Sequence, residues 1–417
     1  METADPSRDI RDRIHVYVAT QQPSYSETFV ATEMRALTEL GEDVVAYSLR
    51  QPPTGLDVEP IRYLAPAVPV RALLRHLPRA VGSWVSVLRR TGRLNYGTYW
   101  RLLYAALHAA RLSSSLDGHL RTHPARHVIL HAHFLGRPAD VVAMTTVKRS
   151  TAHRVVTVHA SDAADFGDRN LRDWRIARMQ LFVCASQYVR SALTDVDPAR
   201  TAIVHCGVDL SRISVANRRG ASANGVRVCT IARLIPTKGH AEAYDFVRSL
   251  AQSGWSVRWD IVGDGPLRAW VQGLAKSSTA GLAIHDHGSL PHPQALNVLS
   301  EADVFLLLSQ TSAQAEGDGI PVALMEAMAL RVPVVTTPVG GIPELVENNK
   351  TGIVVSAKDP EAALAGLLLV LRDEDTRESL LTRAYEMVKG NFEAGACGAL
   401  LLRELDLMTL GTRDASD

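Results

Sequence analysis

The sequence of 417 residues is poor in lysine and cysteine and contains no long apolar run. Lysine occurs only six times among 45 Lys and Arg residues, so composition alone does not explain a lysine inside a motif. The longest apolar run, at 362–371, is too short to cross a bilayer, which takes about 20 residues. The cysteines form no Cys-x-x-Cys pair, which favours free thiols in a reducing compartment over disulfides or a zinc site: Cys184, Cys206, Cys229 and Cys397.

The sequence also lacks a charge excess and a secretory signal. The net charge is +1, so electrostatics gives no reason to expect nucleic-acid binding. The first residues, METADPSRDIRDR, are charged and have no apolar core of a signal peptide. We therefore expect a cytoplasmic protein that does not bind nucleic acid.

Acidic residues are nearly absent between Arg62 and Arg126, where Asp117 stands alone against eleven arginines interleaved with aromatic residues. The favoured interpretation is a pair of amphipathic surface helices. The alternative is a basic face that binds anionic lipid or an anionic acceptor, which would add a membrane-associated population and a peripheral membrane contact through residues 62–126.

Twelve short β-rich runs alternate with helix-like segments, and several are apolar without strict alternation. This pattern is typical of parallel strands that are covered on both faces. It predicts an α/β protein with two Rossmann-like, doubly wound domains. In the first half the runs are IHVYVA, DVVAYSL, HVILHAHF, RVVTVHA, LFVCAS and TAIVHCG; in the second they are VRVCTIA, VRWDIVG, LAIHDHG, ADVFLLL, PVVTT and GIVVS.

A polar stretch from Asp209 to Gly225 interrupts the alternation and is predicted to link the domains. We expect an N-terminal domain at 1–215, a C-terminal domain at 216–390, and a helix at 391–417 that packs back on the N-terminal domain. Ligands of such sheets bind beyond the carboxyl ends of the strands, so the groove between the domains is the expected site.

The segment IARLIPTKGH places Arg233 and Lys238 directly after a strand of the second half. Two cations at this position suit a diphosphate, although a surface loop with ordinary charges is the alternative. The next segment, IVGDGPLRAW, resembles a dinucleotide fingerprint, but Arg268 occupies the place of its third glycine. Gly263 and Gly265 are therefore expected to form a tight turn that opens a helix.

The stretch EGDGIPVALMEAMALRVPVV combines a turn with a short apolar helix. Pro321 suits the first helical position, and the amides around Gly319 and Ile320 would then be free to meet a ligand. Glu326 falls on the second turn among apolar neighbours. It is either a solvent-facing residue or a carboxylate that accepts hydrogen bonds from sugar hydroxyls, which would satisfy it in apolar surroundings.

Three segments of the first half carry polar residues near strand ends. TVHASD places His159 and Asp162 after a strand, where the histidine is either a packing residue or a ligand of the groove. HAHF, at 131–134, is interpreted as structural. In QQPSYSETF, Ser24 and Glu27 have the spacing of a capping box, which predicts a helix N-terminus at the groove.

Taken in order, these segments resemble the retaining family-4 glycosyltransferases of the GT-B type. The resemblance covers most of the chain and is densest from Val226 to about Val355. The segments that carry it are IARLIPTKG, IVGDGPLR, HGSLPHPQALNVLSEADVFLLLSQ, DGIPVALMEAMALRVPVVTTPVGGIPELV and KTGIVV. PSYSETF and HAHF are similar to the branch that builds exopolysaccharides and related glycoconjugates.

The resemblance implies transfer of a sugar from a nucleotide-diphosphate donor, with UDP favoured over GDP, to a glycan, lipid-linked or small-molecule acceptor. No metal or other cofactor is expected. Arg233 and Lys238 would bind the diphosphate, Glu326 the ribose, and His159 the transferred sugar near the reaction centre. The base would lie around Ser289–Pro291. The donor-site residues implied by the resemblance are Arg233, Lys238, Gly263, Leu290, Asp318, Gly319, Ile320, Pro321, Val322 and Glu326.

One position departs from the family pattern of two glutamates eight residues apart. Asp318 stands at the first of these positions, with Glu316 two residues earlier. The Gly-Ile-Pro that follows keeps the register, so we assign the catalytic role to Asp318, whose shorter side chain leaves the donor sugar open. A nucleotide-sugar epimerase or phosphorylase, a periplasmic-type sugar-binding protein and an inactive nucleotide-sugar-binding regulator are the alternatives.

Overall fold

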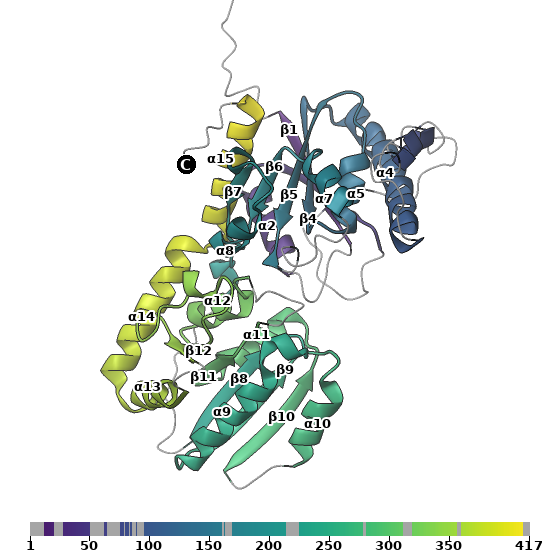
Figure 1. Cartoon of the computed structure of the whole chain (residues 1–417). Coiled ribbons are helices and arrows are strands. Elements are labelled where there is room, and N and C mark those ends of the chain that lie inside the picture. Colours follow the sequence, from purple (N-terminus) through teal and green to yellow (C-terminus); the bar gives the residue numbers. More distant parts are fainter. Residues whose placement is uncertain are drawn as a thin grey trace, which may run out of the picture. The chain divides into compact units, whose positions relative to one another are not determined.

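The structure, a computed structural model, forms two compact units (Figure 1). The N-terminal unit comprises Met1–Val204 and Cys397–Asp417, and the C-terminal unit comprises His205–Ala396. The residues described are 12–20, 28–50, 62–64, 76–78, 80–82, 84–85, 89, 96–160, 162, 169–213, 225–277, 281–311, 319–356 and 360–411.

The N-terminal unit is built on a seven-stranded parallel sheet in the order β3-β2-β1-β4-β5-β6-β7. The order reverses between β1 and β4, which is where ligands bind to doubly wound sheets. All seven residues of β1 are buried, as expected for a strand covered on both faces. The strands are β1 (Arg13–Ala19), β2 (Asp43–Ser48), β3 (Arg62–Tyr63), β4 (His127–His133), β5 (Thr151–Val158), β6 (Leu181–Cys184) and β7 (Thr201–Ile203).

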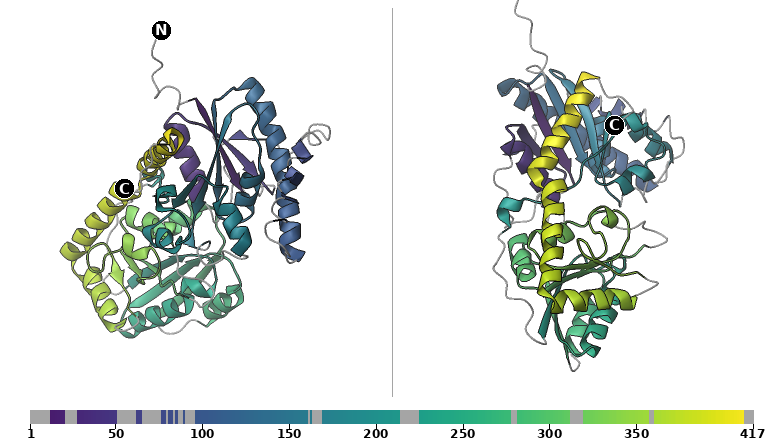
Figure 2. Two further views of the ribbon diagram at one scale, coloured as in Figure 1. Left: turned by 45° about the horizontal axis from the view of Figure 1, so that its top comes forward. Right: turned by 90° about the vertical axis from the view of Figure 1, so that its left-hand side faces the viewer.

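Helices cover both faces of this sheet. One apolar cluster joins the sheet to α4, α5, α7 and α8, and a second joins the other face to α2 and α15. Figure 2 shows α15, in yellow, lying along the N-terminal unit. The helices are α2 (Thr28–Glu39), α4 (Tyr96–Thr122), α5 (Arg137–Met144), α7 (Arg169–Ile176), α8 (Gln187–Ala192), the 3-10 turn η1 (Pro198–Arg200) and α15 (Ala394–Leu410).

The C-terminal unit repeats this topology with six parallel strands in the order β10-β9-β8-β11-β12-β13. Its switch point lies between β8 and β11. The core again forms two layers, one on each face of the sheet, although the edge strand β10 alternates buried and exposed residues. The strands are β8 (Gly225–Ile231), β9 (Ser256–Val262), β10 (Leu282–Gly288), β11 (Val304–Leu307), β12 (Val334–Thr336) and β13 (Ile353–Val354).

The helices of the C-terminal unit divide between these two layers. One cluster contains α9, α10 and α13, the other contains α11 and α12, and α14 contributes to both. The helices are η2 (Leu210–Arg212), η3 (Pro236–Lys238), α9 (His240–Gln252), α10 (Arg268–Lys276), α11 (His292–Ser300), α12 (Val322–Ala329), η4 (Ile342–Glu344), α13 (Pro360–Arg372) and α14 (Glu374–Asn391).

The two doubly wound parallel sheets confirm the predicted fold class, and each of the twelve predicted runs contains a strand. The short strand β3 had no sequence signal. The C-terminal unit already includes residue 205, because Val208 bridges Glu393, so the structure divides before the polar stretch on which the boundary at 215 was placed. Most of that stretch lies outside the described residues.

The described part of the basic segment is mainly one amphipathic helix, with one face packed on the sheet and other residues exposed. Its second half is α4, which packs on the sheet through residues with less than 5 % exposure, namely Leu102, Ala105, Ala106, Ala109, Ala110, Leu112, Leu116 and Leu120. Much of its first half lies outside the described residues. In the part of the chain that the structure describes, no helix combines the length and the apolar character that crossing a bilayer requires.

Candidate functional site

The loops that follow β8 and β11 meet at the switch point of the C-terminal unit. Gly239 has a left-handed φ of 67°, and a Cβ atom there would lie 1.6 Å from the carbonyl oxygen of Leu308. Only glycine permits this approach. The N–H of Gln310 also donates to the carbonyl oxygen of Thr237, at 2.8 Å. The η3 turn, which ends at Lys238, is therefore held against the end of β11.

Both cations predicted to bind a diphosphate lie in this loop. Arg233 is exposed and Lys238 is half-buried. Burial lowers the pKa of His240, and its neutral ring donates from Nε2 to the carbonyl oxygen of Arg233 at 2.9 Å. The hydrogen bond from His240 thus fixes the backbone of the loop, while the side chain of Arg233 remains exposed to solvent.

Two glycines after β9 complete this edge of the sheet. A Cβ atom on Gly263 would lie 1.9 Å from the carbonyl oxygen of Ala232, and one on Gly265 would lie 2.6 Å from that of Leu234. The N–H of Gly263 donates to the carbonyl oxygen of Gly288 at 2.8 Å. The loops after β8, β9 and β10 are therefore packed backbone to backbone. The turn precedes α10, as the sequence predicted.

Glu326 is 7 % exposed on α12 among apolar residues, and it has a partner that the sequence did not suggest. Its Oε1 lies 2.6 Å from Nε2 of His292, the first residue of α11. An ionised carboxylate only accepts, so His292 donates. The imidazole therefore accounts for one oxygen of Glu326, and the ribose contact expected from the sequence stays a prediction. His292 itself sits in SLPHPQ, where no spacing pattern marks it.

The remaining residues predicted to bind the donor lie at the ends of β10 and at the start of α12. Leu290 is half-buried directly after β10. Gly319 and Ile320 lead into α12, which begins at Val322, so Pro321 precedes the helix rather than opening it. The first amides of a helix have no acceptor within it and are available to an anion. Asp318 and Glu316 lie outside the described residues, and the assignment of Asp318 stays a prediction.

In the N-terminal unit, His159 follows β5 and is partly exposed. Its backbone N–H donates to Oδ2 of Asp162 at 3.0 Å, while the N–H of Leu135 donates to Oδ1 at 3.0 Å. Asp162 therefore ties the loop after β5 to the loop after β4. Phe134, with φ at 72°, packs its ring on His159 at a centroid distance of 4.4 Å.

The imidazole of His159 belongs to a chain of polar side chains. Its Nε2 lies 3.3 Å from Nδ1 of His133, and Nε2 of His133 lies 3.2 Å from Oε1 of Glu33. The same Oε1 accepts a hydrogen bond from the Tyr17 hydroxyl at 2.6 Å. HAHF, interpreted from the sequence as structural, thus supplies a direct partner of His159.

The carboxyl group of this cluster belongs to Glu33. Burial alone would raise the pKa of its carboxyl, but the charge and hydrogen bond of His133, together with His131 and Tyr17, hold it at about 2. Burial lowers the pKa of His131 to about 3 and that of His159 to about 3, so both rings are neutral at pH 7.

Sequence reasoning missed Glu33 and gave His133 no site role. Glu33 lies on α2, a hundred residues from His133, and contacts it only because α2 packs across β4. The alternation of His131 and His133, which puts both rings on one face of a strand, was the available signal. The segment with Ser24 and Glu27 lies outside the described residues.

Two family models cover nearly the whole chain. The model described as glycosyltransferase family 4 matches residues 26–212, and the model described as glycosyl transferases group 1 matches residues 216–387. The first model contains β2 to β7, and the second contains all six strands of the C-terminal sheet.

Two of the relatives come from polysaccharide biosynthesis. The chain is 39 % identical over 202 residues to the colanic acid biosynthesis glycosyltransferase WcaL of Salmonella typhimurium, covering 48 % of this chain and 49 % of that protein. It is 37 % identical over 174 residues to the amylovoran biosynthesis glycosyltransferase AmsK of Erwinia amylovora, covering 42 % and 43 %. The matched region thus spans about half the length of these relatives.

Solved structures share the fold over the full length. HepE of Anabaena, in complex with UDP and glucose, covers 94 % of this chain and 98 % of its own, with a TM-score of 0.66 and 16 % identity. Sucrose-phosphate synthase of Thermosynechococcus elongatus covers 96 % and 100 %, with a TM-score of 0.66 and 15 % identity. Together with the two parallel sheets, these similarities define a protein of the GT-B glycosyltransferase class. The chain belongs to glycosyltransferase family 4, which confirms the resemblance read from its motifs.

Proposed function

We propose that the protein is a retaining glycosyltransferase that moves a sugar from a nucleotide-diphosphate donor to an acceptor hydroxyl, without a metal ion at the diphosphate. A UDP-sugar is the favoured donor and a GDP-sugar the alternative. HepE, which has the same fold, was solved with UDP and with UDP-glucose. The relatives in colanic acid and amylovoran biosynthesis support a glycan or lipid-linked acceptor.

The observation that carries this proposal is the loop after β8. Arg233 and Lys238 lie at the switch point of a doubly wound sheet, on a backbone that is held by Gly239 against Leu308 and by His240. Fixed donors that meet a developing charge without reorganising contribute strongly to catalysis. A leaving diphosphate develops such a charge.

In the proposed reaction, the bond between the anomeric carbon and the diphosphate oxygen breaks while the acceptor oxygen bonds to the same face of that carbon. The departing oxygen takes the acceptor proton. Arg233 and Lys238, with the first amides of α12, would neutralise the leaving diphosphate. His159 would contact the transferred sugar, and Asp318 would hold its hydroxyls.

Glu326 and His292 extend the proposal to the nucleoside. Oε1 of Glu326 is occupied by His292 at 2.6 Å, which leaves Oε2 to accept from a ribose hydroxyl. Leu290, directly after β10, would line the base. Glu326→Gln should therefore raise KM for the donor more than it lowers kcat. Glu347→Gln, at a surface carboxylate paired with Lys350, is the matched control and should change neither constant.

The deciding experiment mixes the full chain with a panel of UDP- and GDP-sugars and follows thermal unfolding and nucleotide release. We expect one nucleotide class to raise the unfolding midpoint, and release of the nucleoside diphosphate to require acceptor. Isomerisation of the sugar without release would indicate an epimerase, and phosphate-dependent release a phosphorylase. Stabilisation without any turnover would leave only a binding protein.

We further propose that the acceptor side includes a peripheral membrane contact through residues 62–126. Trp100 is 49 % exposed and Leu107 38 % exposed on α4, within this basic segment. Interfacial tryptophan beside arginine favours an anionic lipid surface. Flotation with anionic and with neutral vesicles tests the contact, and equal recovery in both would contradict it.

A further inference from the structure

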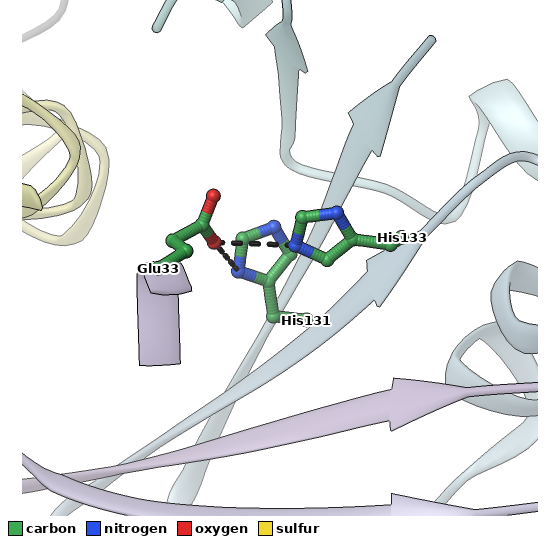
Figure 3. A group of neighbouring side chains, drawn as sticks. All are labelled: Glu33, His131 and His133. Carbon is green, nitrogen blue, oxygen red and sulfur yellow. Dashed lines mark hydrogen bonds and ion pairs between the residues drawn. The ribbon is translucent and has the colours of Figure 1, made fainter. Parts of the chain in front are cut away.

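Two histidines and a glutamate of the N-terminal unit point their polar atoms at one another (Figure 3). His131 and His133 alternate along β4, so their rings lie on one face of the strand, and Glu33 reaches them from α2. Oε1 of Glu33 lies 3.2 Å from Nε2 of His133 and 3.8 Å from Nδ1 of His131. These three atoms all lie within 4.8 Å of one another.

The spacing suits a tetrahedral ion. Zinc bonds of about 2.0–2.1 Å to nitrogen and oxygen at tetrahedral angles separate ligand atoms by roughly 3.3 Å. The two distances from Glu33 lie on either side of this value. Two imidazoles and one carboxylate are also a donor set that Zn²⁺ accepts, with a fourth position left open.

Each of the three side chains has a hydrogen-bond partner beyond the cluster. Nε2 of His131 lies 2.7 Å from the hydroxyl of Thr157, and Nδ1 of His133 lies 3.3 Å from Nε2 of His159. The Tyr17 hydroxyl donates to Oε1 of Glu33 at 2.6 Å. Metal-binding histidines characteristically use their second nitrogen in this way, because that bond fixes the tautomer and the direction of the ring.

The hydrogen bonds within the cluster leave one nitrogen of His131 without a partner and pair Glu33 with no arginine or lysine. Nδ1 of His131 is buried and has no hydrogen-bond partner, although it faces Glu33. Burying a polar atom without a partner is unfavourable. The partners of Glu33 among the described residues are Tyr17, His131 and His133, so no arginine or lysine balances its charge there. A bound cation would satisfy both groups.

A second pair of histidine and glutamate on the same sheet shows the contrast. His15 on β1 lies 2.9 Å from Glu42, but the same carboxylate forms a two-pronged ion pair with the guanidinium of Arg13. The charge of Glu42 is therefore balanced by the chain itself. Among the described contacts of Glu33 there is no arginine or lysine.

We propose that Glu33, His131 and His133 bind one zinc ion. The site lies in the N-terminal unit and is independent of the diphosphate chemistry proposed for Arg233 and Lys238. The ion would cross-link α2 to β4 and fix the ring of His133, the partner of His159.

Metal content and metal titration of the full chain, prepared without a polyhistidine tag, test the site. After removal of metal with a chelator, we expect one equivalent of Zn²⁺ to bind and to raise the thermal midpoint. Cobalt should bind at the same place and give the visible absorption of a tetrahedral site. Wild-type protein that takes up no equivalent of either ion, or whose midpoint does not rise, would overturn the proposal, whatever its transferase activity.

Variants locate the ion. His131→Gln and Glu33→Gln should lose the stoichiometric equivalent, and Thr157→Val, which removes only the hydroxyl behind His131, should weaken affinity about 10–100-fold. His153→Gln is the matched control, because His153 is also a buried strand histidine paired with another imidazole, His127. Uptake that is unchanged in His131→Gln and Glu33→Gln, or lost equally in His153→Gln, would contradict the assignment. The cobalt spectrum of the wild type decides the matter even where a variant does not fold.

Discussion

The two units of the chain share a topology and differ in what stands at its switch point. In the N-terminal unit, the order of strands reverses between β1 and β4, and the residues there are imidazoles and a carboxylate. In the C-terminal unit, it reverses between β8 and β11, and the residues are an arginine, a lysine and glycine-bearing turns. The fold therefore determines where in each unit a ligand can bind. The few residues that follow each strand determine which chemical groups meet that ligand.

The units also differ in how they bury a charged aspartate. In the N-terminal unit, Asp140 is fully buried and pairs with Arg175, whose side chain is 4 % exposed, and with Arg101. In the C-terminal unit, Asp260 is 1 % exposed, but its partners Arg227 and Arg258 are 25 % and 43 % exposed. Removing the carboxylate of Asp140 would leave the guanidinium of Arg175 buried without its ion pair. Removing that of Asp260 would leave two arginines that are already partly exposed to solvent and can be hydrated.

The largest expected effect on stability follows from this difference. Asp140→Ala should lower the free energy of unfolding by about 3–5 kcal/mol, because it leaves the guanidinium of Arg175 buried and unpaired. Asp260→Ala should cost clearly less. Urea denaturation, with hydrogen exchange resolved by unit, measures both. Asp117→Ala, at a carboxylate whose partners Arg121 and Arg149 are exposed, is the surface control. Equal losses for Asp140 and Asp260 would remove the distinction between the units.

The loop after β8 is expected to matter for turnover rather than for stability. Lys238→Ala should lower turnover about 10²–10³-fold, which is the usual cost of one contact to a developing anion. Thermal unfolding should stay unchanged, since Lys238 is half-buried at the surface of a loop that Gly239 and His240 hold. Nucleotide release measures the first quantity. A Lys238→Ala enzyme with wild-type turnover would contradict the proposed role.

The fold was predictable because parallel strands buried on both faces carry a strong local signal. ADVFLLL and LFVCAS stand out as short, largely apolar runs of strand length. The β3 strand of two residues is too short to show any period. Its place in the sheet depends on pairing with Val45 and Ala46 on β2, which no local pattern encodes.

The candidate site was predictable only where the chemistry is local. Arg233, Lys238 and Gly239 lie within seven residues of one loop, so a single sequence motif was enough to predict them. His292 reaches Glu326 from another helix, and Glu33 reaches His133 across a hundred residues. Such pairs arise from packing between elements, and a single sequence carries no record of which helix lies beside which strand.

Acid should weaken both units through their paired carboxylates. Burial alone would raise the pKa of Asp260, but hydrogen bonds from Arg258, Arg227 and His287 hold it at about 2. Burial would likewise raise the pKa of Glu42, which Arg13 and His15 hold at about 2. In both cases the pKa is lower in the folded state, so the contribution to stability is complete above the ordinary pKa values of 3.8 and 4.5 and is lost as the pH falls towards 2.

The test compares Asp260→Asn with Glu42→Gln. Each variant should be less stable than wild type at pH 7, and the difference should shrink as the pH falls from about 4.5 to about 2, because the protonated wild type resembles the amide. Chemical denaturation at a series of pH values measures it, with hydrogen exchange reporting on each unit. A difference that stays constant across this window would show that these carboxylates are not the groups that titrate.

The smallest expected effect belongs to an ion pair at the surface whose two side chains are both exposed. Lys350 and Glu347 are 2.7 Å apart, but their side chains are 57 % and 45 % exposed. In an exposed pair the attraction between the two charges is nearly offset by the cost of ordering both side chains. Lys350→Ala should therefore change the free energy of unfolding by no more than about 0.5 kcal/mol. The change should vanish at 1 M salt, where the screening length is about 3 Å.

Turnover should be that of the wild type, in contrast to Lys238→Ala, because Lys350 precedes the amino end of β13, whereas ligands of such sheets bind beyond the carboxyl ends of the strands. A loss of turnover at Lys350 equal to that at Lys238 would mean that general surface charge, rather than the place of one lysine beside β11, attracts the donor.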